Sequence, residues 1–241
     1  MLNVEKLSVF YGGVKALNEL SMRLEPSRIY GLIGPNGAGK STAINAISGA
    51  IRPTAGSIRL RDRDLTAQVA HERARAGIGR TFQNLALFQS MTVYENIACG
   101  ALHARGAAGR GDAATAVDRL IEEFGLEAVR DRHTKALPLG IRKRVELARA
   151  FASNPSVLLL DEPAAGLTPE DMEDLKRRVQ GLRDAGGIAL IVEHHMGLVM
   201  SLCEHLYVLE FGKLIASGSP QQVVADPLVQ AAYFGGDDEI E

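Results

Sequence analysis

Two hydrophobic patterns alternate along this chain and predict two kinds of secondary structure. Apolar and β-branched runs, which are typical of buried strands, occur at 2–10, 20–24, 29–33, 157–160 and 188–192. Apolar residues at helical spacing occur at 40–50, 112–130, 140–153, 169–185 and 195–203. Because strands and helices alternate at both ends of the chain, we predict an α/β fold whose core is a largely parallel sheet.

The middle of the chain departs from this alternation. Between about residues 84 and 153 the strand pattern disappears, and a Gly- and Ala-rich segment at 101–126 leads into helical spacing. We interpret residues 84–153, approximately, as a helical subdomain inserted into the α/β core. The whole chain, residues 1–241, is then a single domain, which is consistent with its length.

Composition and charge disfavour nucleic acid as a partner. The chain is 46% hydrophobic and 23% charged, which is ordinary for a soluble globular protein. Its formal net charge is −2 and its sequence pI is about 6.3, so it lacks the broad basic surface that binding to duplex nucleic acid usually requires.

The cysteines and the N-terminus indicate a cytoplasmic location. Cys99 and Cys203 belong to no paired motif, which suggests reduced thiols. Glu5 and Lys6 interrupt the apolar stretch that a signal peptide would need. The apolar runs are also far shorter than the roughly 20 residues that span a bilayer, so a role at a membrane would have to come through a partner.

The segment GPNGAGKS, residues 34–41, carries the strongest chemical signal. It follows an apolar run and precedes a helical one, which is the context of a phosphate-binding loop. Its glycines let the backbone N–H groups face the β-phosphate of a nucleotide. We predict that Lys40 bridges the β- and γ-phosphates and that Ser41 ligates Mg²⁺. The predicted nucleotide-binding residues of this loop are Gly34, Pro35, Asn36, Gly37, Ala38, Gly39, Lys40, Ser41 and Thr42.

Two acidic residues, Asp161 and Glu162, follow the apolar run at 157–160. A buried strand that delivers a carboxylate to a phosphate site lets the first residue hold Mg²⁺ and the second polarise the attacking water. Taken alone, such a pair is more often a solvated strand end, so the prediction depends on the phosphate-binding loop upstream. We therefore predict Asp161 as a metal ligand, Glu162 as the catalytic base, and ATP and Mg²⁺ as cofactors.

Three isolated residues are weaker candidates. His194 follows the run at 188–192 and is predicted to sense the γ-phosphate, although a histidine at a strand end is usually structural. Gln83 lies at the junction with the helical insert, where its amide could reach Mg²⁺ or the attacking water or simply face solvent. Tyr11 could stack on adenine or be a core or edge tyrosine. His195 is expected to point the other way, to the surface.

These motifs resemble those of an ABC-transporter ATP-binding subunit, and the resemblance covers essentially the whole chain. Its segments are GPNGAGKST, RTFQN, LPLGIRKRVELARAF, VLLLDEPAAGL and IVEHHMGLVM. FQNLALFQSMTVYENI, DEPAAGLTPE and DPLVQAAYFGG are most similar to the branched-chain amino-acid importers of the LivG type. Subunits for urea transport or lipopolysaccharide export are close alternatives.

The resemblance implies a P-loop NTPase core of the ABC ATPase type, with an inserted helical subdomain and an N-terminal antiparallel β region. It implies a Mg-dependent ATPase that pairs with a second ABC ATP-binding subunit, as a homodimer or a heterodimer, and sandwiches ATP. Further implied partners are integral-membrane permease subunits and an extracytoplasmic solute-binding protein. The implied location is cytoplasmic, peripheral on the inner face of the cell membrane.

The family's LSGGQ signature falls at residues 137–141 and is altered here. Pro138, Leu139 and Ile141 replace its serine, first glycine and glutamine. Pro138 offers neither a hydroxyl nor a backbone N–H to the γ-phosphate on the opposite subunit. Gly140 still permits close backbone approach, and the following helix N-terminus still favours an anion. We interpret the segment as a weakened signature that faces ATP. The alternative is that the segment only forms the start of the following helix.

The predicted function is ATP hydrolysis that powers import of branched-chain or other hydrophobic amino acids through a permease. One alternative is a soluble ABC-type ATPase of DNA repair or translation, but the chain lacks the second cassette and the long coiled-coil insertions usual there. Another is a small-molecule phosphotransferase, which would have no need of the signature segment, Gln83 and His194.

Overall fold

A six-stranded, largely parallel sheet forms the centre of the computed structural model, which describes residues 1–82, 85–102 and 110–234. The strand order is β10-β9-β3-β8-β7-β6, and every neighbouring pair is parallel except β10 with β9. This confirms the predicted α/β fold. The strands are β3 (Arg28–Ile33), β6 (Ile78–Arg80), β7 (Val157–Asp161), β8 (Ile188–Val192), β9 (His205–Glu210) and β10 (Lys213–Gly218).

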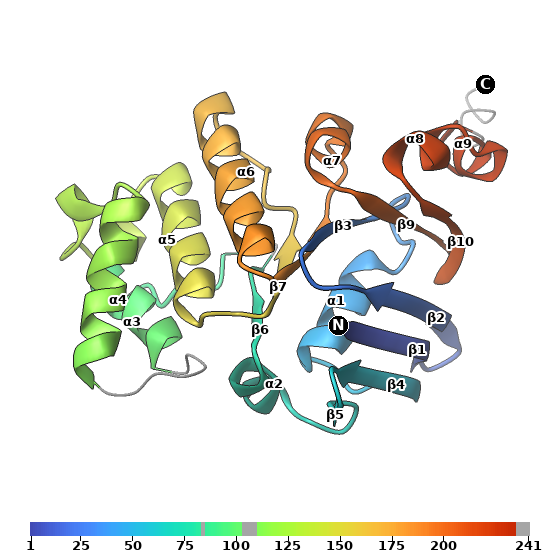
Figure 1. Cartoon of the computed structure of the whole chain (residues 1–241), viewed down its shortest axis with the longest axis horizontal. Helices are drawn as coiled ribbons and strands as arrows, with labels where there is room; N and C mark the ends of the chain where they lie inside the picture. The colour runs from blue at the N-terminus through green and yellow to red at the C-terminus, as the bar shows by residue number, and fades with distance from the viewer. Residues whose placement is uncertain (83–84, 103–109, 235–241) are drawn as a thin grey trace.

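A second, antiparallel sheet is built mainly from the N-terminal segment, and helix α1 (Lys40–Ser48) packs between the two sheets (Figure 1). The strand order of this second sheet is β2-β1-β4-β5. Buried side chains of α1 share one apolar cluster with both sheets. The N-terminal antiparallel region implied by the resemblance is therefore present. Its strands are β1 (Leu2–Tyr11), β2 (Val14–Leu24), β4 (Ala55–Leu60) and β5 (Arg63–Asp64).

The central strands are buried on both faces. Val157 and Leu159 of β7 belong to the cluster around α1, whereas Leu158 and Leu160 belong to a second cluster formed with the helices on the other face. Side chains alternate between the faces of a strand, so a strand covered on both sides must be apolar throughout. This explains why β7 and β8 read as continuous apolar runs.

Helices α3 (Val93–Ala101), α4 (Arg110–Glu123) and α5 (Leu139–Ala152) gather at one end of the molecule (Figure 1). They fall within the range for which the sequence predicts a helical subdomain. Helices α6 (Pro169–Asp184) and α7 (Met196–Leu202) cover the second face of the parallel sheet. Helices α8 (Pro220–Val224) and α9 (Pro227–Phe234) lie at the opposite end. Across the described ranges, no helix has both the length and the apolar character that crossing a membrane requires.

The predicted helix at 112–130 was too long. Helix α4 ends at Glu123, because Gly125 adopts a positive φ of 60°, and a short 3₁₀ turn follows at Glu127–Val129. Helix α2 (Ala70–Ala76) was not predicted at all. Its only buried residue is Arg73, so it has no hydrophobic period for sequence analysis to detect.

Arg73 is fully buried and holds the end of α1 in place. Its guanidinium donates to the carbonyl oxygens of Ala46 at 2.5 Å, Ile47 at 2.8 Å, Thr66 at 3.1 Å and Gln68 at 3.0 Å. The first two carbonyls lie in the last turn of α1, where backbone acceptors lack the usual donor four residues on; the N–H of Gly49 also donates to Ala46. One side chain therefore joins α1 to the segment that follows β5.

We expect Arg73→Met to lower the free energy of unfolding by about 2–4 kcal/mol, because it leaves several buried carbonyl groups without a donor. Urea denaturation followed by circular dichroism measures this change. Arg75→Met, in the same helix but exposed, is the matched control and should lie within about 0.5 kcal/mol of the parent. Equal stability of the two variants would contradict the role given to Arg73.

Candidate active site

The carboxyl ends of β3, β7 and β8 meet at one edge of the parallel sheet. Leu32 of β3 pairs with Val192 of β8, and Val192 pairs with Asp161 of β7. The loop that begins at Gly34 therefore emerges beside Asp161. Ligands of open parallel sheets bind at this edge.

The loop at 34–41 has a backbone shape that only glycine accommodates at two positions. Gly34 has a φ of 149°, and a Cβ atom there would lie 2.1 Å from the carbonyl oxygen of Leu209. Gly39 has a φ of 103°, and a Cβ atom there would lie 2.5 Å from the carbonyl oxygen of Ala16. Gly39 is also the N-cap of α1, so no side chain covers the first N–H groups of this helix.

The Lys40 ammonium lies inside the curl of this loop. Its Nζ donates to the carbonyl oxygens of Gly34 at 2.7 Å and Pro35 at 2.8 Å. Burial lowers the pKa of Lys40, and the nearby carboxylates of Glu162 and Asp161 oppose that shift. The Lys40 ammonium therefore lies close to the start of α1. An anionic ligand could contact both.

An open groove of about 440 Å³ runs along the loop, which is within the range of roughly 300–1,000 Å³ typical of small-molecule sites. Its walls come from four segments: the β1–β2 hairpin, the phosphate-binding loop, the end of β7 and the β9–β10 turn. The lining residues are Val14, Lys15, Ala16, Asn36, Gly37, Ala38, Gly39, Lys40, Ser41, Thr42, Glu162 and Phe211.

Asp161 ends β7 with a buried carboxylate, and its Oδ1 has no hydrogen-bond partner. Burial raises the pKa of Asp161, whereas the Arg80 guanidinium, 3.9 Å from Oδ2, lowers it. Ser41 lies in the first turn of α1 and lines the adjacent groove. A buried carboxylate oxygen without a partner and a serine hydroxyl are both oxygen donors of the kind that Mg²⁺ prefers.

Arg80 connects Asp161 to α1. Its Nη1 donates to Asn45 Oδ1 at 2.9 Å and to Ser48 Oγ at 2.7 Å, both on α1. Burial lowers the pKa of Arg80, and the charge of Asp161 opposes that shift. The basic residue at the end of β6 was not identified from the sequence, because its partners are far away along the chain.

Glu162 follows Asp161 with a positive φ of 49°, an unfavourable backbone conformation for a residue with a side chain. Its N–H donates to the carbonyl oxygen of Val192 at 2.9 Å, which anchors it to β8. Its side chain lines the groove together with Lys40. Strained backbone of this kind persists where the surrounding structure fixes it, and it clusters at active sites.

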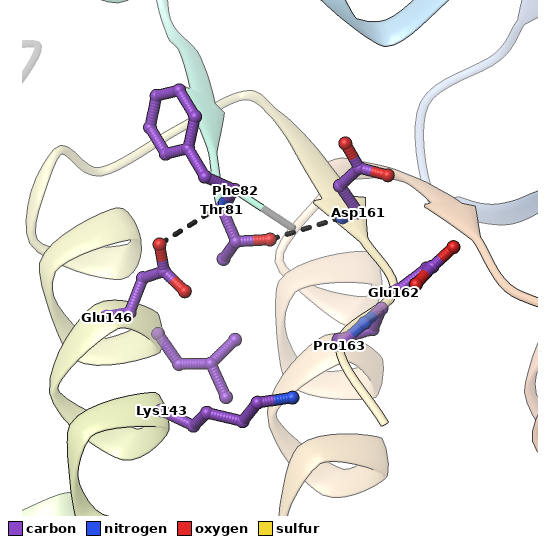
Figure 2. A pocket seen from close by; sticks show the side chains of 8 residues that line it. Thr81, Phe82, Lys143, Glu146, Asp161, Glu162 and Pro163 are labelled. Carbon is purple, nitrogen blue, oxygen red and sulfur yellow. Dashed lines mark hydrogen bonds between the residues drawn. The ribbon is translucent and has the colours of Figure 1, made fainter. Parts of the chain in front are cut away.

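Residues of helix α5 line a small pocket together with the acidic pair, as Figure 2 shows. Glu146 of α5 is buried and accepts hydrogen bonds from the N–H groups of Phe82 at 3.2 Å and Ala86 at 3.3 Å. Burial raises the pKa of Glu146. Lys143 donates to the carbonyl oxygen of Ala165, in the loop after β7. These contacts tie the helical end of the molecule to the strand ends that form the site.

Glu193 is a buried residue that the sequence analysis missed. Its Oε1 accepts from the N–H of Ala164 at 2.8 Å, and its Oε2 accepts from those of His194 at 3.0 Å and His195 at 3.2 Å. It thereby joins the loops after β7 and β8. A carboxylate directly after an apolar run, as at Asp161, was the signal that could have identified it.

The structure does not bring all predicted residues together. Within the described part of the chain, neither His194 nor Tyr11 is among the residues that line the groove, and both are exposed. Gly140 lies in the first turn of α5, also apart from the groove. His195 is exposed, and its Nδ1 accepts from the N–H of Leu198 at 3.1 Å, which caps α7. Gln83 lies outside the described residues.

Comparison with models of known protein families identifies the family of this chain. A family model described as "ABC transporter" matches residues 17–165. The chain belongs to the ABC transporter ATP-binding subunits. A second model, described as "Branched-chain amino acid ATP-binding cassette transporter", matches residues 213–239 of this ABC ATPase. The family hydrolyses ATP to drive transport, so the chain is an enzyme that binds nucleotide.

Two kinds of curated relative are equally similar to this ABC ATPase. The lipopolysaccharide export ATP-binding protein LptB of Haemophilus influenzae is 38% identical over 98% of this chain and 97% of its own. The high-affinity branched-chain amino acid transport ATP-binding protein LivG of Escherichia coli K12 is 38% identical over 98% of each chain. Sequence identity alone therefore does not separate the two.

Solved structures of ABC cassettes share the fold. A nucleotide-free ATP-binding cassette superposes with a TM-score of 0.86 at 31% identity, covering 98% of this chain and 99% of the other. An ADP conformation of a cassette superposes with a TM-score of 0.83 at 32% identity, covering 98% of each. The fold prediction of an ABC-type P-loop NTPase is confirmed.

Proposed function

We propose that this ABC ATPase hydrolyses Mg–ATP to power import of branched-chain or other hydrophobic amino acids. The observation that carries this proposal is the match of residues 213–239 to the branched-chain amino-acid family model. That segment covers β10, α8 and α9. The similarity to LptB supports lipopolysaccharide export as the second candidate. The C-terminal match favours amino-acid import over it.

ATP would bind with its phosphates against the loop at 34–41. Lys40 would exchange its two carbonyl acceptors, Gly34 and Pro35, for β- and γ-phosphate oxygens, which are stronger acceptors because they are charged. The uncovered N–H groups at the start of α1 would face the same phosphates. The open groove leaves room for the rest of the nucleotide.

Hydrolysis would depend on the polar groups at the strand ends. Asp161 and Ser41 are the residues proposed to hold Mg²⁺, which when bound neutralises charge on the β- and γ-phosphates. Glu162 is proposed to polarise the attacking water, and His194 to contact the γ-phosphate. Gln83 keeps its proposed role at Mg²⁺ or the water on the strength of the family resemblance.

We further propose that the enzyme works as a sandwich with a second ABC ATP-binding subunit. Each ATP would lie between one subunit's phosphate-binding loop and the partner's signature segment. Here that segment includes Pro138, the N-cap of α5, which supplies no side-chain cap, and Gly140 follows in the first turn. The proposed assembly includes integral-membrane permease subunits and an extracytoplasmic solute-binding protein. The proposed location of the ATPase is the cytoplasmic face of the membrane.

The transported solute can be tested in proteoliposomes that contain this ATPase with the permease subunits and second cassette that co-purify with it. We expect ATP-dependent uptake of labelled leucine in the presence of the matching binding protein. The Lys40→Ala assembly is the control and should show no uptake. Release of lipopolysaccharide from the vesicles without leucine uptake would contradict amino-acid import and support the second candidate.

Lys40→Ala and Glu162→Gln should separate nucleotide binding from hydrolysis. Lys40→Ala removes the phosphate contact and should weaken ATP binding. Glu162→Gln should bind ATP normally but lose at least about 100-fold in turnover, because the amide cannot accept a proton from water. Calorimetric ATP affinity and phosphate release by the full transporter measure the two effects. Wild-type turnover by Glu162→Gln would remove Glu162 from the mechanism.

The altered signature predicts two unequal ATP sites if the partner cassette has an intact one. The site that contains Pro138 lacks a hydrogen-bond donor to a developing phosphate charge, which should cost about 2–4 kcal/mol of transition-state stabilisation, or roughly 30- to 1,000-fold in rate. The other site pairs this chain's own Glu162 with the intact signature. Transport should therefore suffer more from Glu162→Gln than from the equivalent change in the partner. Equal losses, or a fully active homodimer, would contradict the asymmetry.

A further inference from the structure

Glu193 is a buried carboxylate to which the proposed hydrolysis mechanism assigns no role. It directly follows β8 and is 1% exposed. Both of its oxygens are in use, because Oε1 accepts from the N–H of Ala164 and Oε2 accepts from those of His194 and His195. A carboxylate is costly to bury, so its presence indicates a requirement that a neutral side chain does not meet.

The requirement is for two acceptor oxygens on one side chain. All three partners of Glu193 are N–H groups, and a carboxylate can accept at both oxygens. The amide of a glutamine would turn its NH₂ group either toward Ala164 or toward His194 and His195, and two donors would then face each other. A carboxylate therefore fits these donors where its amide isostere does not.

The Oε1 contact fixes the turn that contains Glu162. The N–H of Glu162 donates to the carbonyl oxygen of Val192 at 2.9 Å, and two residues further on the N–H of Ala164 donates to Glu193 Oε1 at 2.8 Å. Two consecutive residues at the end of β8 thus hold two points of the turn after β7. Glu162, with its positive φ of 49°, lies within this segment, so both bonds help to maintain its unfavourable backbone conformation.

The Oε2 contacts fix the start of the segment that contains His194. This oxygen accepts from the N–H of His194 at 3.0 Å, and the Nδ1 atom of the same histidine lies 4.0 Å from it. The imidazole is 69% exposed, so the neighbouring carboxylate restrains it more than core packing does. One side chain therefore contacts the backbone of both segments that carry the proposed hydrolytic residues.

We propose that Glu193 is a positioning residue for ATP hydrolysis, which holds Glu162 and His194 at a fixed separation so that both act on the same γ-phosphate. Glu193 itself touches neither the nucleotide nor the attacking water in this arrangement. The inference rests on the proposed roles of Glu162 and His194 in hydrolysis. It predicts that a change at Glu193 affects turnover and spares nucleotide binding.

Glu193→Gln tests this role in the full transporter. We expect turnover, measured as phosphate release, to fall roughly 10- to 100-fold, because a misplacement of about 1 Å can cost that much. The dissociation constant of ATP, measured by calorimetry, should stay within about twofold of the parent value, since the phosphate-binding loop is unchanged. Glu193→Asp keeps two acceptor oxygens but is one methylene shorter, so it should lose the bond to Ala164 and also lower turnover.

Two controls distinguish positioning from stability. Asn96→Asp exchanges amide and acid at another fully buried side chain, in α3, where the amide of Asn96 donates to the carbonyl oxygens of Phe88 at 3.1 Å and Thr92 at 2.9 Å. This matched variant should lower the free energy of unfolding and leave turnover of the folded protein unchanged. In a double-mutant cycle, Glu193→Gln with His194→Ala should lose less than the product of the two single losses, because Glu193 acts partly through His194.

Parent turnover in Glu193→Gln or in Glu193→Asp would overturn the assignment. So would losses that multiply in the double variant, an ATP affinity that falls together with turnover, or an equal loss of turnover in Asn96→Asp, since each of these would indicate a structural role alone. Failure of the proposed hydrolysis mechanism would look different, because Glu162→Gln and His194→Ala would then themselves leave turnover unchanged.

Discussion

The alignment of β3, β7 and β8 at one edge of the parallel sheet is the constraint on which the site depends. Leu32, Val192 and Asp161 stand in one row across these strands. The loop at 34–41 begins two residues after Leu32, and Glu162 and Glu193 directly follow Asp161 and Val192. Three segments that are far apart in sequence thereby bring their polar groups to one place. The pairing of the strands fixes this arrangement.

Buried charged side chains then fix the elements around that edge. Arg73 and Arg80 both hydrogen-bond to the C-terminal half of α1, and Glu193 joins the loops after β7 and β8. Most of these side chains bond to backbone groups rather than to opposite charges. A buried charge that satisfies several backbone groups specifies geometry more than it adds stability. Hydrogen bonds from these buried charged side chains, together with apolar packing, therefore fix the positions of Lys40, Asp161 and Glu162.

Hydrophobic runs and short motifs predicted those strands and site residues whose positions depend on neighbouring residues in the sequence. Continuous apolar runs identified β3, β7 and β8, and the glycine spacing identified the phosphate-binding loop. Helix α2 escaped because its buried residue is an arginine, and β6 escaped because it has only three residues. Glu193 escaped for a different reason. Its importance comes from a hydrogen bond to another loop, which a short sequence window does not contain.

The burial of β7 and β8 on both faces has a consequence for how their pairing is specified. In a strand with one apolar face, a slip of one residue exposes that face to water and is strongly disfavoured. Here Val157 and Leu159 would merely exchange sides with Leu158 and Leu160, so burial alone discriminates weakly between the two pairings. The same slip would move Asp161 out of its row with Val192 and separate Glu193 from the N–H of Ala164, its donor in the loop after β7. The polar residues at the strand ends thus select the pairing of the sheet as well as line its site.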